Sequence, residues 1–485
     1  MRIKVLSLSC AAMLCGCVLP PQESPHPAQL ENSTVGLMGT AVSPTADSWW
    51  DSFHDPQLDR LIRLALQGSP TLAQANARVA AALAQTQSAQ SRLAPGVNGS
   101  VGTFYQHAPA NYLVGAPAAA HASWMSQGGA LLSWDLDLFG RQAAVVRGAR
   151  ALTQSARLDA ESAKLLLAGA IAQTYMELNR QYALADIAKR SEEQRQRIVE
   201  MTRERVVAGL DTRLELREAE GQLPQARVAR EQAREACDIA DHQLATLTGQ
   251  GASAYPSIER PTLNVEAAIP VPTALPINLL ARRPDVLSAR SNIEAADAQR
   301  VSDRAAFYPD VNLWAFAGIG AFGMGDLFDW SARAAGGGPA ISLPLFDAGR
   351  LRAQYRYSET QLDSAIDSYN NTVLSAVQQT ADQITQLDAL ARELTDQQQT
   401  LDATENAYTL AEERYRAGLA SYLSVLSAET QVLAARQGIV DILSAQADTR
   451  VTLLLAVGGS FDPRNTLADA TNTAVSDPLS TLTKP

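Results

Sequence analysis

The sequence of 485 residues predicts an α+β membrane protein that consists of two copies of one half, each with two strands and a long helical hairpin. Three observations predict this class: an internal repeat, two long stretches without proline, and short stretches in which apolar residues alternate. The composition agrees, because a chain rich in Ala, Gln and Leu with only 6% aromatic residues favours long, closely packed helices. The net charge of −11 makes nucleic acid an unsuitable partner.

An internal duplication organises the chain. Pro70 and Pro284 lie 214 positions apart, and Pro95 and Pro309 are separated by the same distance. Further along, the segment ERVVAGL at 204–210 matches ERYRAGL, which begins 209 positions later. Matches of this density over about 180 residues indicate a duplicated half, and the period is far too long for a solenoid repeat.

Two stretches without proline predict continuous long helices. They cover 141–208 and 350–417, which is 68 residues each, or roughly 100 Å of helix. Each stretch stops at a glycine, Gly209 or Gly418, which suits the left-handed end of a helix, and a second helix is expected to run back from there. In the second stretch a seven-residue spacing favours coiled-coil packing, and it is carried by Ile366, Val373, Thr380, Leu387, Leu394, Leu401, Tyr408 and Tyr415.

Strands are expected between these helices and shorter ones over 72–93 and 286–307. The alternating stretches are 97–105, 130–138, 311–320 and 341–345. Runs of this kind suit tilted strands that cross a bilayer, although an ordinary soluble sheet gives the same pattern. We read Gly336-Gly337-Gly338-Pro339 as a loop before the last strand, and expect Asp135 and Asp137 to face water.

Four strands are too few to close a barrel in a membrane, since the smallest closed barrels have about eight. Open strand edges are not tolerated in lipid, so the chain is expected to share a barrel with other copies. Eight strands would come from a dimer and twelve from a trimer.

The first residues resemble a bacterial lipoprotein signal. Arg2 and Lys4 precede a short apolar run that ends in Leu14-Cys15-Gly16-Cys17, so lipid is expected on Cys17, with an ordinary cleaved signal as the alternative. Val18 stands where the inner-membrane retention signal has Asp, which favours delivery to the outer membrane. A tether rich in Pro and Ser follows.

No constellation of residues indicates catalysis. Cys237 is the only cysteine in the body of the chain, so it cannot form an internal disulfide there, and we expect it to be a small buried residue. The five histidines are scattered without the spacing of metal ligands, and no Ser/His/Asp order suggests a nucleophile. The sequence therefore predicts no enzymatic activity, no cofactor and no metal.

Several motifs together resemble the TolC-like outer-membrane efflux proteins, specifically the NodT-type lipoprotein branch. They span about residues 49–459 and are WWDSF at 49–53, LARRPD at 280–285, FYP at 307–309, LPLFDAGR at 343–350 and RYRAGL at 414–419. The resemblance implies a homotrimer with one twelve-stranded outer-membrane barrel, continued by a long α-helical coiled-coil tunnel in the periplasm.

The resemblance also implies a domain organisation and a function. The expected parts are a signal peptide (1–16), a lipidated tether (17–48), a first efflux repeat (49–265), a second repeat (266–460) and a C-terminal tail (461–485). The implied function is an outer-membrane channel of a tripartite pump, which conducts drugs or other toxic small molecules passively. The implied partners are a periplasmic adaptor and an inner-membrane RND-type transporter. A duct for protein secretion, a coiled-coil adaptor or scaffold and an exported enzyme are the competing interpretations.

The resemblance assigns site residues at the helical turns. The expected contacts with the adaptor are Ala208, Gly209, Leu210, Ala417, Gly418 and Leu419. Tyr422 and Leu423 match positions near the gate of related channels, while Ser427 stands where some relatives have an Asp that rings the pore. Arg414 and Arg416 are candidates to latch the gate by pairing with Glu412, Glu413 or Asp211.

Overall fold

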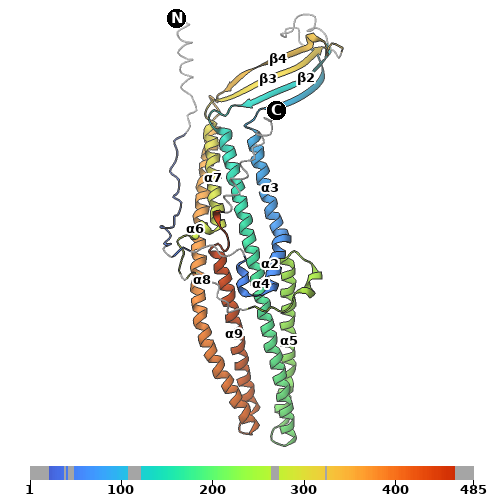
Figure 1. The fold of residues 1–485 in the computed structure, drawn as a ribbon, viewed down its shortest axis with the longest axis vertical. Helices are drawn as coiled ribbons and strands as arrows, with labels where there is room; N and C mark the ends of the chain where they lie inside the picture. The colour runs from blue at the N-terminus through green and yellow to red at the C-terminus, as the bar shows by residue number, and fades with distance from the viewer. Residues whose placement is uncertain are drawn as a thin grey trace. The chain divides into compact units, whose positions relative to one another are not determined.

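The computed structural model describes residues 21–37, 40–41, 48–107, 122–263, 272, 274–322 and 325–464. The predicted signal peptide and lipidated Cys17 lie outside these residues. The described elements, in chain order, are η2 (Trp49–Phe53), α2 (Pro56–Gly68), α3 (Pro70–Ser91), β1 (Gly96–His107), β2 (Ala122–Asp135), α4 (Arg141–Val207), α5 (Arg213–Leu247), η3 (Ala252–Ser257), α6 (Leu279–Arg282), α7 (Pro284–Ala305), β3 (Asp310–Phe322), η4 (Trp330–Ala332), β4 (Arg333–Ser342), α8 (Arg350–Arg416) and α9 (Tyr422–Ala456) (Figure 1).

The chain divides into two compact units, each assembled from three separate segments. The sheet unit takes its described residues from Met1–Gln29, Arg78–Ala156 and Ala289–Tyr369, and the helical unit takes its own from Leu30–Ala77, Arg157–Ser288 and Asn370–Pro485. Each unit therefore contains matched elements from both halves of the sequence.

The two long helices confirm the prediction from the stretches without proline. α4 and α8 have 67 residues each. Asp137 stands before α4, and its carboxylate accepts hydrogen bonds from the backbone N–H of Gln142 at 2.8 Å and of Ala143 at 2.7 Å. A carboxylate at this place satisfies free N–H groups and favours the helix dipole, so the expectation that Asp137 lies on a strand facing water was wrong. No described helix has an apolar stretch long enough to cross a membrane.

Both hairpin turns adopt the predicted left-handed conformation. Gly209 has φ +74° and Gly418 has φ +73°. The backbone N–H of Leu210 donates to Arg205 O at 2.9 Å, and that of Leu419 donates to Arg414 O at 2.8 Å. These bonds over five residues satisfy carbonyls at the helix ends, after which α5 and α9 run back along the hairpin.

The four strands form one antiparallel sheet in the order β1-β2-β3-β4. β2 ends at Asp135 and β4 ends at Ser342, so Leu136, Leu138 and residues 343–345 lie outside the strands where they were expected. The expected loop 336–339 is instead part of β4. Three glycines and a proline are typical of a turn, but β4 is an edge of the described sheet, and an edge strand tolerates proline.

The register divides the sheet into two faces of different chemistry. One face, which we call the apolar face, includes Val97, Val101, Leu132, Trp134, Leu313, Ala315 and Ile341. The other, which we call the polar face, carries every Asn, Gln and Asp of the described strands, and includes Asn98, Ser100, Gln127, Ser133, Asp135, Asn312 and Ser342. On the apolar face, the Thr103 and Ser126 hydroxyls bond to each other at 3.0 Å.

The WWDSF motif belongs to the core of the helical unit. Trp49, Trp50 and Phe53 are buried against α2, α4 and α5. Asp55 follows the motif and caps α2, and its carboxylate accepts a hydrogen bond from the Tyr175 hydroxyl at 2.9 Å. This buried network holds the WWDSF segment and the start of α2 against the long helix α4.

The helical unit also preserves the duplication in three dimensions. Gly249 and Gly458 have φ +74° and +92°, and they lie 209 positions apart. A Cβ at Gly249 would stand 2.7 Å from Gly68 O, and one at Gly458 would stand 2.1 Å from Arg282 O. Because Gly68 and Arg282 are themselves 214 positions apart, the same close backbone approach occurs once in each half.

Candidate functional site

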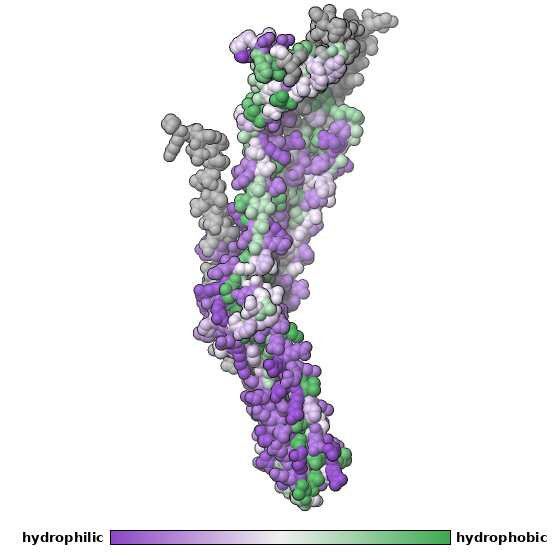
Figure 2. Space-filling model, turned by 90° about the vertical axis from the view of Figure 1, so that its right-hand side faces the viewer, coloured by the Kyte–Doolittle hydropathy of each residue, from purple (hydrophilic) through white to green (hydrophobic). Residues whose placement is uncertain are grey.

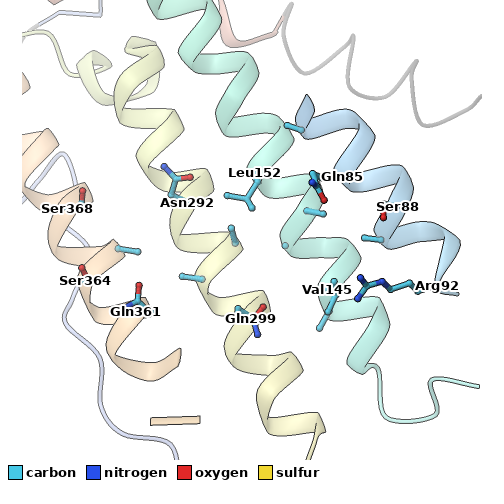
Figure 3. A pocket seen from close by; sticks show the side chains of 18 residues that line it. Gln85, Ser88, Arg92, Val145, Leu152, Asn292, Gln299, Gln361, Ser364 and Ser368 are labelled. Carbon is cyan, nitrogen blue, oxygen red and sulfur yellow. The ribbon is translucent and has the colours of Figure 1, made fainter. Parts of the chain in front are cut away.

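A groove runs between four helices of the sheet unit, α3, α4, α7 and α8, with a volume of about 840 Å³ (Figure 3). Its lining consists almost entirely of alanine and small or neutral polar residues. Arg92 is the only charged side chain among the described lining residues. The labelled polar residues are Gln85, Ser88, Asn292, Gln299, Gln361, Ser364 and Ser368. Such a surface is wetted by water and offers no cluster of charged groups to retain a solute.

A second hollow, of about 430 Å³, lies where β2 and β4 end and β3 begins. It takes Asp135 and Ser342 from the polar face of the sheet, Asp303 from α7 and Gln354 from α8. Gln354 is seven residues before Gln361 of the groove, and Asp303 is seven after Ala296, so hollow and groove share one face of both helices. The groove, the hollow and the polar face therefore form one continuous surface, which we call the polar wall.

The turns at the hairpin ends expose the residues predicted to contact an adaptor. All six of them are exposed, and Leu210 and Leu419 keep 65% and 71% of their surface accessible. Val207, Leu214 and Leu423 add further exposed apolar surface beside them. Apolar side chains are visible among the polar ones at the ends of the hairpins in Figure 2.

A buried polar cluster lies just behind the turns, and we call it the tip cluster: Thr202, Arg205, Asp211 and Tyr415. The Arg205 guanidinium donates to the Asp211 carboxylate at 2.9 Å, and both side chains are about nine-tenths buried. The Tyr415 hydroxyl donates to the same carboxylate at 2.6 Å and lies 2.9 Å from the Thr202 hydroxyl. The cluster thereby joins the first hairpin to the second.

Electrostatics favours the charged form of this cluster. The hydrogen bond from Arg205 holds the pKa of Asp211 below its ordinary value, against the opposing effect of burial. Burial raises the pKa of Tyr415 to about 12, so its hydroxyl keeps the proton that it donates. The Arg205 guanidinium also lies 4.6 Å from the centre of the Tyr415 ring, which adds a cation–π contact.

The residues predicted to form a latch or gate are arranged differently. Arg416 pairs with Glu412 at 2.6 Å, but both are partly exposed, and such a pair contributes little. Arg414, Leu423 and Ser427 are exposed, whereas Tyr422 is buried, with its ring centre 6.3 Å from that of Tyr415. Of the three proposed acidic partners, Asp211 is in the buried cluster, and its cation is Arg205.

Sequence reasoning missed Arg205 and Tyr415, although a signal was present. The two halves differ at Tyr415, which corresponds to Val206, and at Asp211, which corresponds to Ala420, whereas Arg205 corresponds to Arg414. A position at which the two halves carry different residues can therefore mark a contact between the first hairpin and the second.

A second buried pair joins the hairpins further from the turns. Arg195 on α4 donates to Glu429 on α9 at 3.2 Å, and Glu429 is only 1% exposed. Arg195 also donates to the carbonyl of Gln222 at 3.0 Å. Burial raises the pKa of Glu429, and the charge of Arg195 opposes that rise. Among the described residues no group of three or more acidic, His or Cys side chains is arranged to hold a metal.

Comparison with known proteins places the chain in one family. The model of the outer membrane efflux protein family matches twice, at residues 61–250 and 275–459. The fusaric acid resistance protein FusA of Burkholderia cepacia is 35% identical over 360 residues, which cover 72% of this chain and 67% of that protein. The multidrug resistance outer membrane protein MdtP of Escherichia coli K12 is 30% identical over 476 residues, which cover 94% of this chain and 95% of that protein.

A solved structure agrees with the family assignment. The outer membrane protein VceC of Vibrio cholerae superposes with a TM-score of 0.80 and 31% identity, over 87% of this chain and all of that one. The sheet with two helical hairpins is thus the fold of outer-membrane channels. The two family matches, the relatives and the fold agree, and the chain belongs to the outer membrane efflux protein family.

Proposed function

We propose that the chain is the outer-membrane channel subunit of a tripartite efflux pump, and that the polar wall is the inner surface of its conduit. The observation that carries this proposal is the continuity of the wall from the helical groove through the hollow to the sheet. A passive duct needs a wetted surface without strong binding sites, and the small neutral residues of the groove meet that need.

The sheet supports a barrel shared between copies of the chain. In the described sheet, β1 and β4 each have one unpaired edge, and lipid does not tolerate such edges. The apolar face is suited to lipid and the polar face to water, as in transmembrane barrels. Three copies would join β1 of one to β4 of the next and close a twelve-stranded barrel. A dimer would close only eight strands, and barrels of that size are filled by their own side chains.

The tips support docking to a periplasmic adaptor that is itself bound to an inner-membrane RND-type transporter. Val207, Leu210 and Leu214 on one tip and Leu419 and Leu423 on the other expose apolar surface that nothing covers in the described chain. Exposed apolar groups rimmed by charged residues mark sites of protein association. The expected docking residues at 208–210 and 417–419 lie at this surface.

The names of the relatives indicate the class of cargo. FusA is named for resistance to fusaric acid and MdtP for multidrug resistance. By analogy we propose that this channel exports toxic small organic molecules rather than secreted proteins.

The N-terminal segment supports attachment to the same membrane by a lipid on Cys17. The Glu23 carboxylate pairs with Arg300 of α7 at 3.1 Å and also with Arg304. The Ser24 N–H donates to Glu359 of α8 at 3.1 Å. Cys17 lies six positions before Glu23, and a stretch of that length spans at most about 20 Å. An acyl group on Cys17 would therefore be held close to the end of α7, the helix that leads into β3.

Cys17→Ala is expected to remove the lipid. Wild-type protein from cells fed labelled palmitate should carry the label, and the variant should not. Cys15→Ala, two residues earlier, is the matched control and should still be labelled. Label on Cys17→Ala at the level of wild type would contradict the assignment.

The proposed function is tested by the accumulation of small toxic compounds in a strain that lacks this gene. Deletion should raise intracellular accumulation several-fold, and wild-type protein should restore export. Unchanged accumulation across a broad panel of such compounds would contradict the proposal and favour a role in protein secretion.

A further inference from the structure

Four aromatic side chains of the described strands lie on the polar face of the sheet, Phe104, Trp314, Phe316 and Phe322, and the middle two stack on each other. Trp314 and Phe316 of β3 share this face with Asn312 and Ser133. Their ring centres are 5.9 Å apart, and the ring planes differ by only 8°. Each keeps more than a third of its surface accessible, 37% for Trp314 and 38% for Phe316. Leu131, the partner of Phe316 on β2, is also exposed.

The neighbouring strand makes room for these rings. In the register of β3 with β4, Gly338 is opposite Trp314 and Gly336 is opposite Phe316. A Cβ at Gly336 would stand only 2.7 Å from Cε1 of Phe316, so the Phe316 ring occupies the space above that glycine. One side of the Phe316 ring therefore packs against β4, while the ring stays partly exposed to water.

Covering a glycine with an aromatic ring is a known way to stabilise a sheet, and it explains why Phe316 leans on β4. It does not explain why Trp314 is parallel to Phe316 and also exposed on the face that the proposed function assigns to water. The exposed face of the indole is not buried and so adds no hydrophobic stabilisation to the fold, but it can stack with a planar molecule.

We propose that Trp314, Phe316 and Leu131 form a stacking platform that transiently binds planar aromatic export substrates on the conduit wall. This inference rests on the proposed function, because the platform meets cargo only if the polar face lines the conduit. The occupant is set by shape: the two rings are nearly parallel, and their exposed faces suit a planar π system. The paired Ser133 hydroxyl and Asn312 amide, 3.1 Å apart, supply hydrogen-bonding groups beside that surface for a polar substituent.

The platform is tested by ligand NMR on the purified full-length protein in detergent. Caffeine, a neutral planar aromatic molecule, is the probe, and hexamethylenetetramine, a neutral cage without a π face, is the control molecule. We expect saturation transfer to caffeine but not to the cage. Stacking on an aromatic side chain contributes about 1–3 kcal/mol by alanine substitution, so Trp314→Leu should weaken caffeine binding roughly tenfold, whereas Trp314→Phe should retain most of it.

Trp134→Leu, on the apolar face, is the matched variant and should leave caffeine binding unchanged. Equal transfer to both molecules, or binding that Trp314→Leu does not weaken, would overturn the platform. If Trp314→Leu lowers the melting temperature without a change in binding, the rings only stabilise the sheet and the inference is also wrong. All of these outcomes concern the platform alone, because export of non-planar compounds does not depend on it. If wild-type protein failed to export any toxic compound, planar or not, the proposed function itself would be refuted.

Discussion

Gly418→Trp is expected to abolish export while the protein still reaches the outer membrane. Gly418 has φ +73°, and the nearest atom to an added Cβ, Arg205 Nη2, is 3.9 Å away, so there is space for a side chain. The left-handed conformation costs a non-glycine residue about 1–2 kcal/mol, which a protein of this size can tolerate. The indole would stand on the exposed tip beside Leu419 and would separate it from the proposed adaptor.

The expected result is accumulation of toxic compounds at the level of the deletion strain, with wild-type amounts of the protein in the outer membrane. Gly325→Trp is the matched control, because Gly325 is also exposed in a turn and has no atom within 4 Å of an added Cβ. It should export like wild type. Full export by Gly418→Trp would show that the turn is not a docking surface.

Asp211→Ala is expected to open the channel in the absence of a pump. The substitution removes the acceptor of both Arg205 and Tyr415, and leaves a nine-tenths buried guanidinium without its carboxylate. Removing one partner of a buried ion pair lowers the stability of the folded protein by about 3–5 kcal/mol. The two hairpins would then separate at the tip, and we propose that this contact holds the resting channel closed.

The expected result is a rise of tenfold or more in sensitivity to vancomycin, which is too large for ordinary outer-membrane pores, in a strain without the partner pump. Glu412→Ala is the matched control, since it removes only the partly exposed Arg416–Glu412 pair and should leave sensitivity unchanged. Equal sensitivity of Asp211→Ala and wild type would mean that the tip cluster does not gate the channel.

The tip cluster should be insensitive to pH in the physiological range. The hydrogen bond from Arg205 holds the pKa of Asp211 below its ordinary value. A carboxyl group with a lowered pKa stabilises the folded state at every pH above the pKa that the group has in the unfolded chain. That stabilisation is lost only as the pH falls through the pKa of the folded state. Tyr415, with a pKa of about 12, stays protonated over the same range. In a Glu429→Gln variant, which removes the other buried carboxylate between the hairpins, conductance of the purified channel should therefore be constant from pH 5 to 8, and a transition within that range would contradict this account.

The sequence predicted the long helices almost to the residue, because proline and glycine act locally. Residues 141–208 and 350–417 were expected to be helical, and α4 and α8 end at Val207 and Arg416. The strands were less well predicted. Apolar alternation continues to Leu138, but β2 ends at Asp135, and after one more backbone hydrogen bond, from Leu136 N–H to Val311 O at 3.0 Å, the chain turns away and Asp137 caps α4.

The sites were predicted unevenly for a similar reason. The exposed turns follow from a local motif, so residues 208–210 and 417–419 could be identified. The tip cluster depends on contacts between Thr202, Asp211 and Tyr415 that join the two halves over more than 200 residues. The polar wall could not be predicted either, since it depends on which faces of four helices and a sheet are brought together.

The most direct test of the central claim asks which face of the sheet meets water. Ser100 and Val101 are neighbours on β1, both exposed, and they lie on the polar and apolar faces respectively. Burial raises the pKa of the native Cys237 thiol to about 11, so this cysteine should stay unreactive. A membrane-impermeant thiol reagent should label Ser100→Cys and lower the conductance of the channel, and should leave Val101→Cys unlabelled. The reverse pattern, or equal labelling of both, would contradict a conduit lined by the polar wall.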